Sequence, residues 1–276
     1  MSEVQRVALG LEYDGSRYRG WQVQTHADSV QARVEAALAR IADHPVNVTC
    51  AGRTDAGVHA LGQVVHFDTR ARRPGHAWVL GGNSWLPSDI SVAWARPVAP
   101  GFHARFSARW RRYRYVIFNR RARSGPHRDR ACWHHHRLDV QVMRRAARQL
   151  LGRHDFSSFR AAACQARSPS RTVHAITLRR RGHFIIMDAW ADGFLHHMVR
   201  NIAGTLMTVG RHERSPAWVA EVLAARDRRQ AGITAPAQGL YFLAAGYPAR
   251  FDLPPIGAPP GAAPGPLSDD GQCGIW

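Results

Sequence analysis

One segment of the sequence, residues 51–60, carries the side chains best suited to chemistry. It reads Ala-Gly-Arg-Thr-Asp-Ala-Gly-Val-His-Ala and falls between two strand-like segments. Its two glycines permit a tight backbone path, so the loop can present Asp55 at the end of a sheet. Arg53 and His59 add positive charge nearby, which keeps an aspartate ionised and favours a nucleophile or charge stabiliser over a general acid. The alternative is a structural turn in which Asp55 bonds its own backbone.

A second candidate segment, residues 109–115, mixes arginine with aromatic residues. In a strand, Tyr113 and Tyr115 share one face, and Arg112 and Arg114 take the other. Aromatic rings stack on unpaired bases while arginine binds phosphate, so this pattern is typical of RNA binding. The alternative is an ordinary strand whose tyrosines are half in the core and whose arginines reach outward.

Arg200 lies in a predicted helix whose other residues are mostly apolar. A buried arginine usually pairs with a carboxylate. Acidic residues are scarce in this chain, and Asp55 is one candidate partner. The alternative is that the Arg200 side chain reaches solvent.

Cys132 and the run of histidines at 134–136 raise the question of a zinc site. Adjacent residues cannot all face one ion, and no paired ligand spacing accompanies them, so we predict no metal. The four cysteines form no C-x-x-C pair, which favours free thiols in a reducing cytoplasm. The N-terminus lacks the basic and apolar regions of a secretory signal, so we expect a cytoplasmic protein.

The charge of the whole chain indicates which classes of partner it can bind. The sequence has 276 residues and a formal net charge of +18, and all 38 of its basic residues are arginine. An excess this large favours a polyanionic partner, with nucleic acid as the leading candidate, over a basic enzyme without one. No run of 18 apolar residues occurs, which argues against a transmembrane helix and a membrane partner.

Hydrophobic periodicity predicts the elements that must position these residues. The order β-α-β-β-α-β occurs twice. In the first half the predicted strands and helices are strands 7–13, 46–50, 63–69 and 90–98 and helices 30–41 and 77–85. In the second half they are strands 110–118, 172–178, 184–190 and 240–245, helices 143–151 and 197–209, and a further helix starting at Ser215-Pro216.

This repeated order predicts an α+β fold of two ferredoxin-like halves, each with an antiparallel sheet, and an active-site cleft between them. The expected domains are residues 1–100, with the Asp55 loop, and residues 101–250. Residues 251–276 are rich in proline and glycine and are expected to form a tail without chemistry.

Several of these segments, taken together and in unbroken order over residues 5–250, resemble the tRNA pseudouridine synthase A family. The string Gly-Arg-Thr-Asp-Ala-Gly-Val-His at 52–59 is the most specific. The other matching segments are Leu11 to Gly15, Gly20 to Gln22, Gly62 to Phe67, Phe102 to Ser107, Arg111 to Tyr115, Phe156 to Arg160 and His196 to Asn201.

The resemblance implies an isomerase that converts uridine to pseudouridine at positions 38, 39 and 40 in the anticodon arm of tRNA, with no cofactor and no metal. It implies that Asp55 is the nucleophile and that Arg200 is its ion-pair partner. Tyr113 corresponds to the residue that packs on the uracil. Arg53 corresponds to the residue that enters the gap left by the flipped nucleotide.

The resemblance also implies a set of tRNA contacts and a homodimeric assembly. Arg73, Arg105 and Arg121 correspond to tRNA-binding positions. Two segments correspond to lining positions, and their assigned residues are Phe102, His103, Phe106, Cys164, Gln165 and Arg167. The alternative functions are a non-catalytic RNA-binding protein with a duplicated fold and a zinc hydrolase that uses Cys132 and the histidine run.

Overall fold

An alternating strand at the start of the chain organises the first of two structural units. The computed structural model describes residues 4–254, and these divide into a first unit of residues 4–109 and 242–254 and a second unit of residues 110–241. In order along the chain, the strands and α-helices of the first unit are β1 (Gln5–Tyr13), α1 (Val30–Ala42), β2 (Thr49–Cys50), β3 (His59–Thr69), α2 (Gly75–Trp85), β4 (Ile90–Val98) and most of β10 (Leu240–Gly246).

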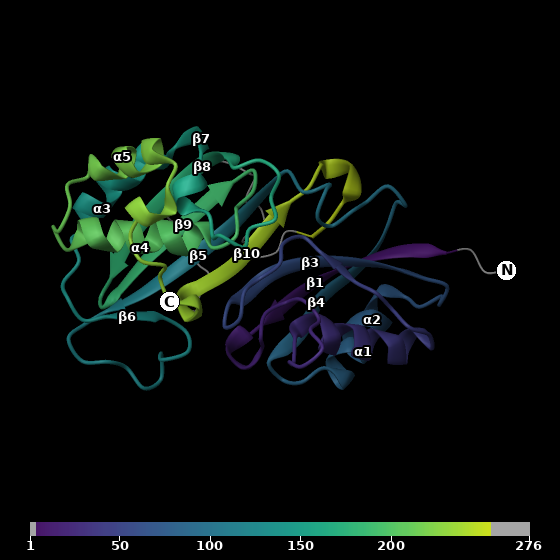
Figure 1. Ribbon diagram of the computed structural model, residues 1–276. Helices are drawn as coiled ribbons and strands as arrows, with labels where there is room; N and C mark the ends of the chain where they lie inside the picture. Colours follow the sequence, from purple (N-terminus) through teal and green to yellow (C-terminus); the bar gives the residue numbers. More distant parts are fainter. Residues whose placement is uncertain (1–3, 255–276) are drawn as a thin grey trace. The chain divides into compact units, whose positions relative to one another are not determined.

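The sheet of the first unit has β1 at its centre. β1 runs antiparallel to β3 on one side and to β4 on the other, and β2 adds a short antiparallel pair to β3. The strand order is β4-β1-β3, followed by β10. Figure 1 shows α1 and α2 packed on one face of this sheet. Val7, Leu9 and Leu11 of β1 are among the residues that form the core.

The strands of the second unit follow the order β5-β9-β8-β7. Its strands and α-helices are β5 (Trp110–Asn119), β6 (Cys132–His134), α3 (Val140–Ala147), β7 (Gly152–Asp155), β8 (Ser170–Arg181), β9 (Phe184–Ala191), α4 (Met198–Gly210) and α5 (Trp218–Ala225). In the order β5-β9-β8-β7, each strand runs antiparallel to the next. β6 pairs with β5 in parallel. α4 carries the densest run of buried residues in the unit, including Met198, Ile202 and Leu206.

Much of the predicted order of elements is confirmed. Helices and mainly antiparallel strands give a mixed α/β structure, in agreement with the α+β prediction. The strand 90–98 lies where it was predicted. The chain turns between β8 and β9 at residues 182 and 183, where Gly182 takes a φ of 54°. Ser29 is the N-cap of α1, and its hydroxyl accepts the Ala32 N–H.

Four details of the prediction were wrong. The strand predicted over 46–50 is only two residues long. The helix predicted to reach residue 151 ends at Ala147 and tightens into a 3₁₀ turn over 148–150, and Gly152 with a φ of 94° then starts β7. β6 and β7 were not predicted, because strands of three and four residues carry too little periodicity to detect. The last helix begins at Trp218, after a turn in which its N–H donates to Ser215 O.

Residues just past 100 pack with the first unit, although the sequence placed a boundary at residue 100. The Arg6 guanidinium donates to the carbonyls of Pro100 and Phe102, and the Tyr247 hydroxyl donates to the carbonyl of Ala104. The expected tail starts at Phe251, which is buried, and residues 255–276 of that tail lie outside the described part of the chain. Within the described part, none of the helices is both long and apolar enough to cross a membrane.

Candidate active site

The loop that carries Asp55 connects β2 to β3 and has a fixed backbone. The Trp21 N–H donates to the Thr54 carbonyl at 2.9 Å. Directly after it, the Val58 N–H donates to the main-chain carbonyl of Asp55 at 3.1 Å and closes a turn. The Asp55 side chain is half-buried. A half-buried carboxylate on a pinned loop has the accessibility and the fixed position that a nucleophile needs.

Two glycines bring the segment after β1 into direct contact with this loop. A Cβ on Gly20 would lie 2.8 Å from the Thr54 carbonyl oxygen, and Gly20 has a φ of 100°, which disfavours any side chain. A Cβ on Gly15 would lie 1.9 Å from the carbonyl oxygen of Val58. Only glycine permits this close approach at either position.

Buried polar side chains form hydrogen bonds to the start of the loop. The Gln63 amide pairs with Gly52 at both backbone groups, donating to its carbonyl at 2.7 Å and accepting its N–H at 3.4 Å. The Tyr13 hydroxyl lies 2.8 Å from the Thr54 hydroxyl and 3.4 Å from the Gln63 amide nitrogen. Burial raises the pKa of Tyr13 well above its usual range, so this hydroxyl stays protonated.

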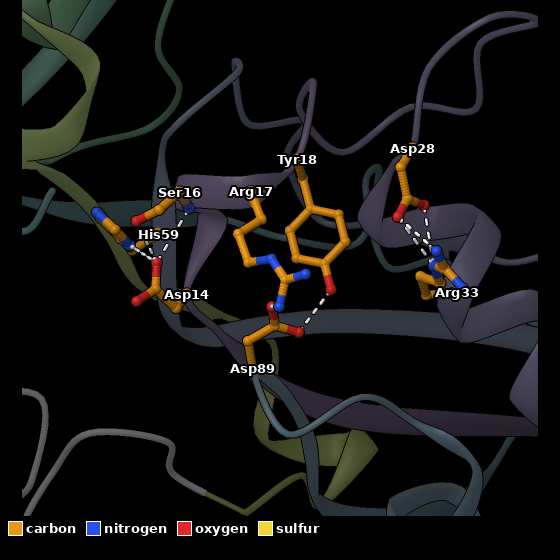
Figure 2. A network of polar contacts seen from close by, with 8 residues as sticks. All are labelled: Asp14, Ser16, Arg17, Tyr18, Asp28, Arg33, His59 and Asp89. Carbon is orange, nitrogen blue, oxygen red and sulfur yellow. Dashed lines mark hydrogen bonds and ion pairs between the residues drawn. The ribbon is translucent and has the colours of Figure 1, made fainter.

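A contact between Asp14 and His59 anchors the far end of the loop. Figure 2 shows Asp14 beside His59, with 3.1 Å between its carboxylate and His59 Nδ1. The Gly15 nitrogen lies 3.2 Å from the same Nδ1, and the Ser16 hydroxyl and N–H both donate to Asp14. The hydrogen bond with His59 holds the pKa of Asp14 well below its usual range, and those from Ser16 add to the effect.

Tyr18 links the middle of the loop to the start of β4. The Gly57 N–H donates to the Tyr18 carbonyl at 3.3 Å, while the Tyr18 hydroxyl donates to Asp89 at 2.5 Å. Beside it, Asp28 and Arg33 form a bidentate ion pair across the first turns of α1 (Figure 2). The loop is therefore supported by β1, by the segment after it and by β3.

The predicted site residues of the first unit differ in exposure. Arg53 and Arg105 are exposed, and both guanidinium groups act on the buried Cys50 thiol. Burial raises the pKa of that thiol to about 12, and the two arginines offset only part of the rise. Arg73 is also exposed, and its Nε donates to the Ile41 carbonyl at 3.2 Å.

The predicted lining segment 102–106 combines a buried anchor with an exposed tip. Phe102 is fully buried, so its side chain supports the segment from inside. His103 accepts the N–H groups of Arg105 and Phe106 on Nδ1, and its ring lies 4.4 Å from the Phe106 ring. Phe106 is 76% exposed, an unusual position for a phenylalanine that suits stacking on a base. His66, whose pKa burial lowers to about 4, accepts the Ala104 N–H and fixes the segment.

In the second unit, the predicted alternation along β5 is confirmed. Tyr113 is buried, and its ring meets the Phe194 ring edge-on at 5.1 Å. On the opposite face, Arg114 and Arg112 bind Asp188 at 2.7 and 3.1 Å. Arg114 is only 3% exposed, so the hypothesis that it binds phosphate is wrong.

Arg200 lies in the first turn of α4 and is half-buried. Its Nε donates to the Ala235 carbonyl at 2.8 Å, and its charge lowers the pKa of Tyr115, although burial raises that pKa far more. His197, the N-cap of α4, has a φ of 61°, in the left-handed region that costs free energy for residues other than glycine. Asp55 and Arg200 lie in different units.

The remaining predicted residues lie on two loops of the second unit. Arg160 donates to the carbonyls of Cys164 and Ala166, which fixes the loop on which Gln165 and Arg167 are exposed. Burial raises the pKa of the Cys164 thiol, but hydrogen bonds from the Ala166 and His196 N–H groups and the charge of Arg160 outweigh it, and the net shift is downward. Arg121 is exposed on the loop after β5.

The residues of the proposed zinc alternative do not converge. Cys132 is buried in β6, and the rings of His135 and His136 pack on each other at 3.9 Å. Burial lowers the pKa of His134 to about 4. Among the residues that the structure describes, no three His, Cys, Asp or Glu ligand atoms gather around Cys132 and residues 134–136.

Sequence reasoning missed the residues that hold the loop. Tyr13, Gly20 and Gln63 were recognised only as parts of matching segments. The available signal was a glutamine inside a strand, where a buried amide needs partners. Its partners lie 50 and 11 residues away in sequence, which no local pattern reveals.

Comparison of the sequence with known proteins identifies a family that it matches. Residues 11–107 and 146–248 match a family model described as tRNA pseudouridine synthase. The chain is 54% identical over 250 residues to tRNA pseudouridine synthase A of Hydrogenovibrio crunogenus, covering 91% of this chain and 95% of that protein. It is 56% identical to the proteins of the same name from Methylococcus capsulatus and Pseudomonas aeruginosa, covering 90% and 91% of this chain and 92% and 88% of theirs.

Proposed function

The chain belongs to the tRNA pseudouridine synthase family and is a tRNA uridine isomerase, and from this premise we propose that it modifies uridines 38, 39 and 40 in the anticodon stem-loop of tRNA, in the cytoplasm. One observation supports the proposal above the others: a half-buried aspartate lies on a loop whose backbone is hydrogen-bonded at Gly52, Thr54 and Gly57. RNA binding alone has no need for so closely fixed a carboxylate in a chain this basic.

In the proposed reaction, Asp55 is the nucleophile and attacks C1′ of the ribose or C6 of the uracil. The N1–C1′ bond breaks, the freed uracil turns, and a C5–C1′ bond forms. The C5 proton leaves as N1 gains one, so atoms and electrons balance within the nucleotide. The reaction therefore requires no external oxidant, reductant or group donor.

The proposal gives separate roles to three further residues. Arg200 pairs with Asp55 and keeps it charged and oriented. Tyr113, buried with one edge against Phe194, packs on the uracil and helps to remove the C5 proton. The target base must leave the helix for its C1′ and C5 to be reached, and the exposed Arg53 fills the gap that it leaves.

Exposed basic and aromatic residues are proposed to bind the rest of the tRNA. Unstacking a base costs a few kcal/mol, which contacts to the RNA backbone must offset. Arg73, Arg105 and Arg121 are exposed and are assigned to these contacts. The same proposal assigns lining positions to His103, Phe106, Cys164, Gln165 and Arg167, supported by the buried Phe102. It also includes two ferredoxin-like halves with a cleft and a homodimer.

The test is incubation of the purified protein with an unmodified tRNA transcript, followed by mapping of pseudouridine. We expect modification at positions 38–40. Asp55→Asn is nearly isosteric but lacks the charge, so it should bind tRNA normally and lose turnover. If it kept more than roughly a tenth of the wild-type rate, about 1.4 kcal/mol of barrier, the assignment of the nucleophile would be wrong.

A further inference from the structure

Three buried polar residues, one within the Asp55 loop and two on the strands next to it, have no role in the reaction as proposed so far. They are Tyr13 on β1, Thr54 within the loop and Gln63 on β3, called here the support triad. Their exposed fractions are 4%, 7% and 0%. Buried hydroxyl and amide groups are costly unless each is bonded, so their partners indicate what they do.

The bonds of the support triad all lead to the loop. The Gln63 amide cannot be turned over, because its nitrogen faces the Gly52 carbonyl and its oxygen faces the Gly52 N–H. The same nitrogen donates to Tyr13 Oη at 3.4 Å. The Tyr13 and Thr54 hydroxyls share a further hydrogen bond of 2.8 Å. Gly52 and Thr54 are thereby fixed on either side of Arg53, and Asp55 follows directly.

A strand irregularity brings these side chains together. The register of β1 against β3 shifts between Leu11 and Tyr13: Leu11 is opposite Gln63, and Tyr13 is opposite Ala60. An irregularity of this kind re-aims a side chain and is common beside active sites.

Stability alone gives no reason for this arrangement. Replacing both partners of a buried hydrogen bond by apolar groups of the same shape is nearly neutral for folding, so phenylalanine and valine would serve equally well in place of the bonded pair Tyr13 and Thr54. A fully bonded polar network instead selects one geometry. We infer that Tyr13, Thr54 and Gln63 are positioning residues that hold the Asp55 carboxylate at the angle and depth that turnover requires.

This inference rests on the proposed role of Asp55 and is tested with variants that each remove one atom or group. Tyr13→Phe removes one hydroxyl, and Thr54→Val removes the other while keeping the shape. Thr54→Ser keeps the hydroxyl. The matched control is Thr69→Val at the other end of β3, where a buried hydroxyl binds His44 at 2.8 Å. Thr69 has no bond to the Asp55 loop among its described contacts.

The readouts are single-turnover rate at saturating enzyme, tRNA affinity and thermal stability. We expect Tyr13→Phe and Thr54→Val to be about ten- to a hundred-fold slower, the range expected when a reacting group is displaced by about 1 Å. Their tRNA affinity should stay within about two-fold of wild type, because binding rests on arginines elsewhere. Thr54→Ser and Thr69→Val should turn over at close to the wild-type rate.

The double variant adds a test of coupling. Tyr13→Phe with Thr54→Val removes the same bond twice, so it should be no slower than the slower single variant. The inference is overturned if folded Tyr13→Phe reacts as fast as Thr69→Val. If Thr54→Val does not fold, as lost tRNA affinity would show, Tyr13→Phe decides the question alone. Asp55→Asn serves as the reference: an active Asp55→Asn refutes the proposed nucleophile, whereas an inactive Asp55→Asn beside a fully active Tyr13→Phe refutes only the support triad.

Discussion

Asp188 is the centre of a buried cluster of ion pairs in the second unit. Its carboxylate binds Arg114 at 2.7 Å, Arg112 at 3.1 Å and Arg179 at 3.4 Å, and it is 2% exposed. Burial raises the pKa of Asp188, but the three guanidinium groups outweigh burial and hold it below its usual range. The cluster occupies the face of β5 opposite Tyr113, so its charges stabilise the strand that presents that tyrosine.

Asp188→Asn should destabilise the protein by about 3 kcal/mol at pH 7, because it leaves the buried Arg114 without its counter-charge. The folded pKa of Asp188 is lower than the unfolded value of about 3.9, so its contribution is complete above that pH and is lost as the pH falls through the folded pKa. The difference between wild type and variant should therefore shrink below about pH 4. Urea unfolding at several pH values measures it.

The control for this prediction is Glu213→Gln, which removes an exposed carboxylate paired with Arg211. Surface pairs contribute little, so we expect little change at any pH. Equal stability losses in the two variants would mean that the cluster around Asp188 is no more important than a surface pair.

At the scale of elements, sequence patterns predicted the positions of helices and strands that depend on residues close together in the chain. The strand 90–98 followed from its alternation alone. The end of α3 did not, because Leu150 and Leu151 continue the helical spacing while Gly152 turns the chain into β7. The Asp55 loop was predicted as a loop, but its supports lie on β1 and β3 and arise only from tertiary packing.

Gly20→Ala tests the close approach between the segment after β1 and the Asp55 loop. An alanine at a φ of 100° costs about 1–2 kcal/mol, and its Cβ would lie 2.8 Å from the Thr54 carbonyl, so the loop must shift. We expect lower thermal stability together with a lower single-turnover rate. Gly101→Ala is the control, since a Cβ there meets nothing within 4 Å. A fully active Gly20→Ala would show that the loop tolerates displacement.

At the scale of the whole molecule, the proposed reaction predicts whether turnover needs a metal, and the net charge predicts how tRNA binding depends on salt. Isomerisation conserves every atom of the uridine, so turnover should survive exhaustive chelation. The measurement is pseudouridine formation after treatment with EDTA, compared with an untreated sample. Activity that EDTA abolished and zinc restored would contradict this expectation.

The net charge of +18 predicts tRNA binding that weakens steeply with salt, and single arginines should contribute to it unequally. Arg73→Ala and Arg121→Ala should each weaken binding and lower the log–log salt slope by roughly 0.7–0.9, the value for one phosphate contact. Arg200→Ala should leave that slope nearly unchanged and abolish turnover, because Arg200 is half-buried and is proposed to pair with Asp55. The measurement is tRNA affinity across a salt series beside single-turnover rates.

Arg229→Ala separates a specific contact from net charge in the same experiment. It removes one positive charge from an exposed side chain that pairs with Asp227 at 2.8 Å, so it lowers the net charge as Arg73→Ala does without removing a proposed phosphate contact. Its salt slope should match wild type. If Arg200→Ala instead lowered the slope as Arg73→Ala does and kept near-normal chemistry, Arg200 would be a phosphate contact, and its proposed pairing with Asp55 would be wrong. A slope lowered equally by all four substitutions would mean that tRNA senses the overall field of the protein and that no single arginine is a discrete contact.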